Sequence, residues 1–134
     1  MEVMEAILTR HSTRSFTDKP VPKETLEEIA SAGTYAASGR NRQPVLIVAV
    51  TNPELIAELS RINAEIMGTE GDPFYGAPAV LVVLADKSVP TYLYDGSLVM
   101  GNMMLAATDL SARTAKRFWI SWASKATTRA LATW

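Results

Sequence analysis

The chain has 134 residues, 48% of them hydrophobic and 20% charged, which is enough to bury one core and form one domain. It contains no cysteine, which excludes disulfides, thiolate metal sites and cysteine nucleophiles. The formal net charge of −1 gives no general attraction to nucleic acid or anionic lipid. Without a leader-type segment or a membrane-length apolar run, we expect a cytoplasmic protein with no membrane or nucleic-acid partner.

The charge is distributed unevenly along the chain. Residues 1–110 carry 8 Lys and Arg against 14 Asp and Glu, whereas residues 111–134 carry 5 Lys and Arg and no acid. All 3 tryptophans lie in that last segment, and no glycine follows Gly101. We therefore interpret residues 111–134 as a basic, tryptophan-rich tail distinct from the rest.

Helical spacing of apolar residues predicts the first two elements. A short helix is expected over about 2–10, and a second helix from Pro22 to about Ala36, with proline near its first position. The residues expected on the inward face of the second helix are Leu26, Ile29, Ala30 and Gly33.

Two continuous apolar runs, residues 45–50 and 80–84, predict strands buried on both faces, because they are rich in β-branched residues. Between them, Asn52 as N-cap and Pro53 as first residue predict a third helix that ends near Gly68. A glycine- and proline-containing loop is expected from there to the second strand.

Residues 91–110 have apolar side chains around most of the circumference of a helix. This pattern predicts a helix buried either centrally or in a dimer. Asp95, near its start, is expected to act as a cap rather than as a ligand contact. The element order is compatible with an α/β or an α+β fold and leaves the strand directions open.

The first candidate site is the basic segment over residues 10–16. Arg10 and Arg14, four residues apart with hydroxyl residues between them, offer forked donors that match phosphate oxygens. The alternative is a solvated turn whose cations lie near a helix C-terminus.

The second candidate site lies over residues 36–44. Its small residues allow a ligand to approach the backbone, and Asn41 and Gln43 can both donate and accept hydrogen bonds. The alternative is a connector rich in turn formers. The two segments together hold four of the eight positive charges of residues 1–110, which favours an anion site. These four are Arg10, Arg14, Arg40 and Arg42.

Other chemistries find little support. His11 is the only histidine, and its neighbour Ser12 is poorly placed for a nucleophile and base pair. The chain has neither a glycine-rich dinucleotide fingerprint nor a phosphate-binding loop with a lysine.

The two basic segments resemble the two N-terminal motifs of the nitroreductase family. Residues 10–16, Arg-His-Ser-Thr-Arg-Ser-Phe, match its Arg-x-Ser-x-Arg/Lys-x-Phe/Tyr pattern. Residues 37–45 resemble its Pro-Ser-x-x-Asn-x-Gln-Pro-Trp pattern, with Ala37 in place of proline and Val45 in place of tryptophan. Ala77-Pro78 before the second strand and Tyr94-Asp95-Gly96 on the long helix agree further.

The resemblance implies an α+β flavoprotein that works as a homodimer and binds FMN at the subunit interface. Such proteins transfer hydride from NADH or NADPH to nitroaromatics, quinones or related small-molecule acceptors. Because the flavin carries the chemistry, no catalytic side chain and no metal are expected. The cofactor-binding residues implied by the resemblance are Arg10, His11, Ser12, Arg14, Ala37, Ser38, Gly39 and Asn41.

The resemblance covers residues 1–110 and is not seen in residues 111–134. The family continues with a Gly-Leu-Gly turn and another strand, whereas this chain has Ser111-Ala112-Arg113-Thr114. We interpret the tail as the product of a frameshift or a truncated reading frame, against the alternative of a divergent terminus. An incomplete C-terminal part would favour an inactive flavin-binding remnant over an active reductase.

Overall fold

The computed structural model describes residues 1–114 and 119–122. The helices of this part are α1 (Val3–Thr9), α2 (Lys23–Thr34), α3 (Pro53–Met67) and α4 (Tyr92–Thr114), with a 3₁₀ turn, η1 (Gly39–Asn41). The strands are β1 (Val45–Val50), β2 (Val80–Ala85) and β3 (Trp119–Trp122).

The strands form one mixed sheet in the order β1-β2-β3. β1 and β2 are antiparallel, with Val45 opposite Ala85 and Val50 opposite Val80. β2 and β3 are parallel, joined by the crossover through α4. The expected α+β class is confirmed, and the strand directions that the sequence left open are now defined.

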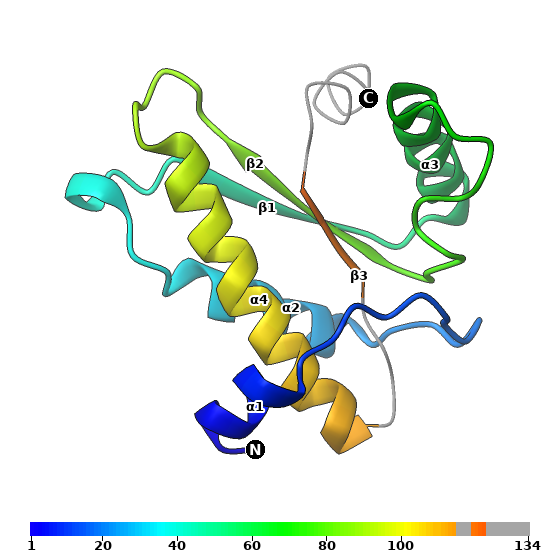
Figure 1. Cartoon of the computed structure of the whole chain (residues 1–134), viewed down its shortest axis with the longest axis horizontal. Coiled ribbons are helices and arrows are strands. Elements are labelled where there is room, and N and C mark those ends of the chain that lie inside the picture. The colour runs from blue at the N-terminus through cyan, green and yellow to red at the C-terminus, as the bar shows by residue number, and fades with distance from the viewer. Residues whose placement is uncertain (115–118, 123–134) are drawn as a thin grey trace.

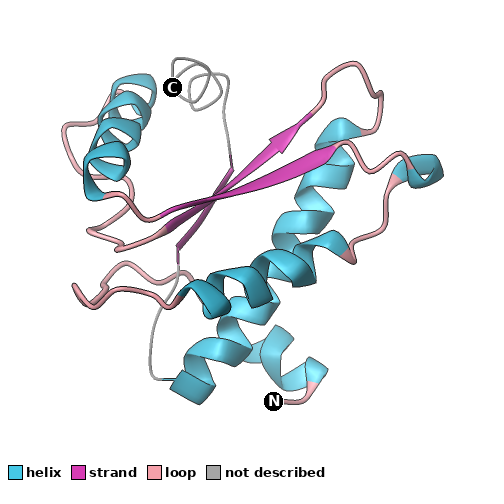
Figure 2. Cartoon of the chain, turned by 180° about the vertical axis from the view of Figure 1, so that it is seen from behind, coloured by secondary structure: helices cyan, strands magenta, loops and turns pink. Residues whose placement is uncertain are grey.

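Helices cover both faces of the sheet, with α2 and α4 on one side and α3 on the other (Figures 1 and 2). The alternation of side chains along β2 explains this arrangement, since successive residues of a strand point to opposite faces. Leu81 and Val83 pack with α2 and α4, whereas Val80 and Val82 pack with Leu59 of α3. The chain therefore has two hydrophobic cores that share a central strand.

Helix α3 begins and ends where the sequence predicts. The Asn52 side chain accepts a hydrogen bond from the N–H of Leu55 at 2.9 Å, and Pro53 is the first helical residue. Gly68 ends the helix in the left-handed conformation, with φ 65°. Asn52 thus caps the N-terminus of the helix, and Gly68 ends it, as expected.

Helix α2 packs closely against both α4 and β1. A Cβ on Gly33 would lie 2.9 Å from Ile47 Cδ1 and 2.9 Å from Met103 Cγ. Glycine therefore sets the distance between these three elements. The helix ends at Thr34, two residues before the expected Ala36, and Ala30 is half-buried rather than fully inward.

The expectation that both central strands are buried on both faces is confirmed for β2 and wrong for β1. β1 is an edge strand within the described sheet, and Leu46 is 61% exposed. A continuous apolar run shows that both faces of a strand are suited to burial. It does not show which other elements cover those faces. Within the described sheet, the outer edge of β1 has no neighbouring strand.

Helix α4 buries one stripe of its surface, formed by Val99, Met103, Ala107 and Leu110. The opposite side of its first turns exposes Leu93, Tyr94 and Leu98. Central burial therefore accounts for only part of the apolar pattern of this helix.

Helix α4 also continues past the composition change at residue 110 as far as Thr114, and residues 119–122 join the sheet. The other residues of the basic tail, 115–118 and 123–134, lie outside the described residues. The interpretation of the tail as frameshifted thus stays a prediction.

Candidate functional site

The first basic segment, named loop A (residues 10–16), follows α1 and is the first part of the connection from α1 to α2. Arg10 ends α1, its N–H donating to the carbonyl of Ala6 at 3.0 Å. At the other end, Phe16 is half-buried and packs against the core that contains Leu59. Between these two anchors the predicted binding side chains are exposed. They are Arg10, His11, Ser12 and Arg14.

The arginines of the two candidate segments are free of carboxylates within the described residues. Arg10, Arg14, Arg40 and Arg42 are exposed, and none of them has an ion-pair partner there. Arg61 differs, since it pairs with two glutamates on α3. Four uncompensated guanidiniums are suited to an external anion, because each keeps its charge at any working pH.

The second basic segment, named loop B (residues 37–43), has an unusual backbone. Arg40, Asn41 and Gln43 adopt φ of 54°, 55° and 48°. Residues other than glycine rarely occupy this left-handed region, and such strain is concentrated at functional sites. The Ser38 hydroxyl closes the loop by accepting from the N–H of Gln43 at 2.8 Å.

Asp95 connects loop B to the long helix. Its carboxylate is 3% exposed and accepts from the N–H of Gly39 at 2.9 Å and from the Thr91 hydroxyl at 2.8 Å. The Ser38 hydroxyl lies 3.5 Å from the same carboxylate. The expected capping role is wrong, because α4 begins at Tyr92 and Asp95 lies within its first turn. The signal for this role in the sequence is an aspartate inside a helix whose other residues are apolar around most of its circumference.

Loops A and B lie far apart in one chain. In Figure 1 loop A is the dark blue segment that leaves α1, and loop B is the cyan segment around η1, at the opposite side; Figure 2 shows the same separation from behind. The N-terminal amino group of Met1, just before α1, forms an ion pair with Asp109, whereas loop B is hydrogen-bonded to Asp95. About 21 Å of helix, at 1.5 Å per residue, lies between these two acids. A single chain does not bring the two motifs together.

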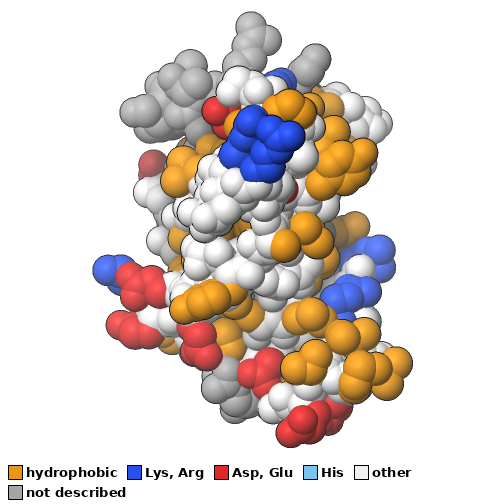
Figure 3. Space-filling model, turned by 90° about the vertical axis from the view of Figure 1, so that its left-hand side faces the viewer, with side chains coloured by type: hydrophobic (Ala, Val, Ile, Leu, Met, Phe, Trp, Pro, Cys, Tyr) orange, Lys and Arg blue, Asp and Glu red, His pale blue; other side chains and the backbone are white. Residues whose placement is uncertain are grey.

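The face of the molecule around η1 and α4 is apolar in many places. Figure 3 shows hydrophobic side chains spread over this face, among separate acidic and basic groups. Leu93, Tyr94 and Leu98 of α4 are 50%, 72% and 50% exposed, and Tyr35 at the end of α2 is 84% exposed. This face therefore exposes more large apolar side chains of α4 than its buried stripe alone explains.

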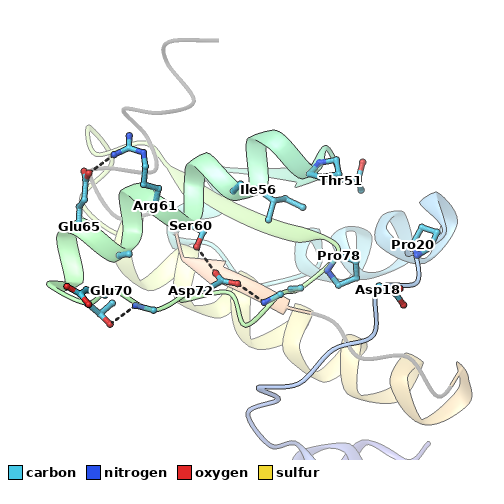
Figure 4. A pocket seen from close by; sticks show the side chains of 17 residues that line it. Asp18, Pro20, Thr51, Ile56, Ser60, Arg61, Glu65, Glu70, Asp72 and Pro78 are labelled. Carbon is cyan, nitrogen blue, oxygen red and sulfur yellow. Dashed lines mark hydrogen bonds and ion pairs between the residues drawn. The ribbon is translucent and has the colours of Figure 1, made fainter.

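A cavity of about 810 Å³ lies elsewhere, between α3, the loop over residues 69–78 and the segment around Asp18 (Figure 4). It is lined by none of the predicted binding residues. Asp72 organises its wall by accepting hydrogen bonds from the Ser60 hydroxyl and from the N–H groups of Phe74 and Gly76. Burial raises the pKa of Asp72, but these three hydrogen bonds together outweigh it and hold the pKa below its ordinary value.

Metal-binding clusters and membrane-spanning helices are both absent from the described residues. Across residues 1–114 and 119–122, no group of three or more histidine, aspartate or glutamate side chains is arranged to hold a metal ion. No helix in the part of the chain that the structure describes is long and apolar enough to cross a membrane.

Comparison with known proteins connects the two loops to one family. The family model described as "Nitroreductase family" matches residues 7–115. The chain is 35% identical over 86 residues to the FMN reductase [NAD(P)H] of Bacillus subtilis, covering 63% of this chain and 32% of the relative. It is 32% identical over 114 residues to an NADH dehydrogenase/NAD(P)H nitroreductase candidate of Archaeoglobus fulgidus, covering 81% of this chain and 63% of the relative.

Solved structures agree with this match. A nitroreductase with bound FMN from Bacteroides fragilis superimposes with a TM-score of 0.75 at 29% identity, covering 83% of this chain and 66% of the other. A second nitroreductase with bound FMN, from Desulfitobacterium hafniense, gives a TM-score of 0.73 at 32% identity, with 83% and 67% covered. The chain spans about 57% to 63% of the length of the two archaeal relatives that it matches.

Proposed function

Because the chain belongs to the nitroreductase family, we propose that it binds FMN and passes hydride from NADH or NADPH to a small-molecule acceptor. Nitroaromatics and quinones are the proposed acceptors. One observation carries the proposal: loops A and B expose four guanidinium groups that have no ion-pair partner within the described residues, on segments in the order and spacing of the family motifs. When bound, FMN would supply the hydride chemistry, and the chain would bind and orient it.

The donor set of loop A fits the phosphate end of FMN. Arg10 and Arg14 are exposed and unpaired within the described residues, so phosphate oxygens can accept their forked N–H groups. Ser12 and His11 lie between them on the same exposed loop and are proposed to bind the phosphate or the ribityl chain. The ring of His11 is already oriented, its Nδ1 lying 3.1 Å from the carbonyl of Thr9.

The composition of loop B fits the flavin ring. Ala37 is small and exposed, so a planar ring can approach the backbone there, and the half-buried Ser38 and Gly39 follow it in the same loop. The exposed Asn41 amide can both donate to and accept from the edge of a pyrimidine ring. We propose that these four residues contact the ring, with their conformation set by the left-handed turn.

We infer that two copies of the chain form the site. Loops A and B lie toward opposite ends of α4, so a two-fold axis across the middle of this helix would bring loop A of one copy to loop B of the other. The exposed Leu93, Tyr94 and Leu98 support this arrangement, because a second copy would cover them.

Two further proposals concern the setting of the protein. We place it in the cytoplasm, where NADH and NADPH are available and a chain without cysteine needs no oxidising compartment. We also propose that residues 1–110 are the family region and that the basic tail, residues 111–134, arose by a frameshift. Sequencing the parent locus tests this, since an intact alternative frame must restore a Gly-Leu-Gly turn and a strand.

The function is tested by an absorbance spectrum of the purified chain after FMN is added and the excess removed, followed by anaerobic NADH or NADPH. We expect retained flavin whose yellow band bleaches on reduction. Retained flavin that does not bleach would support the alternative of an inactive flavin-binding remnant. No retained flavin would contradict both.

A further inference from the structure

We propose that Asp95 is a positioning residue, which fixes loop B in the conformation that receives the flavin ring. The inference rests on the proposed flavin site. Asp95 itself is 3% exposed and lies beneath loop B, so its effect on the flavin must pass through the loop.

The first argument is the hydrogen bonding of the carboxylate. Its Oδ1 accepts from the N–H of Gly39 at 2.9 Å, and its Oδ2 accepts from the Thr91 hydroxyl at 2.8 Å. A buried carboxylate needs such donors, and bonds to a charged acceptor are stronger than bonds between neutral groups. Asp95 therefore couples loop B to the first turn of α4.

The second argument is the close approach of loop B to the same helix start. A Cβ on Gly39 would lie 2.6 Å from Thr91 Oγ1 and 2.8 Å from Thr91 Cγ2. The backbone of Gly39 is thus held against Thr91 as well as bonded to Asp95. This contact leaves the loop little freedom to move along the helix.

The third argument is backbone strain. Arg40, Asn41 and Gln43 hold left-handed conformations that carry an energetic cost for residues with a side chain. Such a turn persists only when its surroundings fix it. Asp95 at Gly39 and Ser38 at Gln43 provide that fixation at the two ends of the turn.

The test compares Asp95→Ala with Asp95→Asn in the full chain. Alanine leaves the Gly39 N–H without its acceptor, and we expect FMN, titrated by quenching of its fluorescence, to bind about tenfold more weakly or worse. Asparagine can still accept from Gly39 through its amide oxygen and donate to the Thr91 hydroxyl, so it should restore most of the affinity. Hydrogen exchange of the flavin-free protein should accelerate over loop B in Asp95→Ala.

Asp72→Ala is the matched control. It truncates another carboxylate that holds a loop through backbone N–H groups, those of Phe74 and Gly76, away from loop B. We expect faster exchange over residues 72–76 with unchanged FMN affinity. Should Asp95→Ala fail to fold, Thr91→Val removes one donor to Asp95, and Thr91→Ser keeps it. Valine should weaken FMN binding about threefold, and serine should not.

Two results would overturn the inference: unchanged FMN affinity in Asp95→Ala, or exchange accelerated equally over β2 and loop B, which indicates general destabilisation. Failure of the proposed function has a different signature. In that case the unmodified chain itself retains no FMN, while exchange of loop B still responds to Asp95→Ala. The role of Asp95 toward a flavin would then be rejected together with the proposed function.

Discussion

Loops A and B are both exposed and basic, but the chain holds them in different ways. Loop A is fixed at its ends, through Arg10 at the end of α1 and Phe16 in the core, and its long side chains extend into solvent. Loop B is fixed along its length by hydrogen bonds to Ser38 and Asp95. From this difference we expect loop A to contribute mainly charge to the proposed flavin site, and loop B to contribute mainly a preformed shape.

The largest expected effect comes from removing the charge of loop A. Arg10→Ala combined with Arg14→Ala should weaken FMN binding about 100-fold, because each guanidinium offers charge-assisted hydrogen bonds to phosphate. Fluorescence titration at low and high salt measures the loss, and the salt dependence should fall as well. The control is Arg61→Ala, which removes an arginine already paired with glutamates. Equal losses in both variants would show a general charge effect.

The next effect comes from displacing loop B. Gly39→Ala places a Cβ 2.6 Å from Thr91 Oγ1, so the loop must shift away from α4. We expect FMN affinity to fall about tenfold, with little change in salt dependence, because shape rather than charge is altered. Gly71→Ala is the matched control, since its Cβ would lie at an ordinary 3.7 Å from Thr69 Oγ1. An unaffected Gly39→Ala would mean that loop B is adaptable.

A smaller effect is expected from loosening loop B without displacing it. Ser38→Ala removes the hydroxyl that accepts from the N–H of Gln43, and the affinity for FMN should fall about threefold. The comparison variant is Thr34→Ala, which removes a local hydrogen bond to the carbonyl of Ser31 at the end of α2. Isothermal titration of both variants distinguishes the two roles. A larger loss in Thr34→Ala would contradict the closure of loop B by Ser38.

The smallest effect on FMN is expected at Asp72, which holds a loop outside the proposed site. Its pKa is lowered in the folded state, so its contribution to stability is complete at neutral pH and is lost as the pH falls below about 4. At pH 7, the free energy of unfolding of Asp72→Asn should therefore be lower than that of the unmodified chain by less than about 1 kcal/mol. This difference should vanish in acid. Urea unfolding across pH measures it. If the difference in unfolding free energy grew in acid, Asp72 would not have a pKa that is lowered by folding.

Local elements could be predicted from the sequence because their signals are local. Asn52 and Pro53 start α3 as expected, since an N-cap and a proline act within one turn. The apolar run at residues 80–84 indicates a buried strand, and β2 is buried in its first four residues. The motif of loop A likewise lies on one exposed loop.

Relations between distant segments could not be predicted in the same way. The apolar pattern of β1 does not show that Leu46 lies on an exposed edge, because periodicity carries no information about the neighbouring element. The separation of loops A and B follows from the path of α4, which spacing along the chain does not reveal. The bond between Asp95 and Gly39 joins residues 56 positions apart, and only the fold brings them together.

The central claim is that loop A of one copy and loop B of another form one flavin site. The direct test is to co-express two differently tagged chains, one with Arg10→Ala and Arg14→Ala, the other with Gly39→Ala and Asn41→Ala, and to purify the mixed dimer by both tags. We expect neither variant alone to retain FMN and the mixed dimer to retain it at one site per pair of chains, since one pairing joins two unmodified loops. A mixed dimer as empty as its parents would contradict the claim, because a site built within one chain is damaged in both copies.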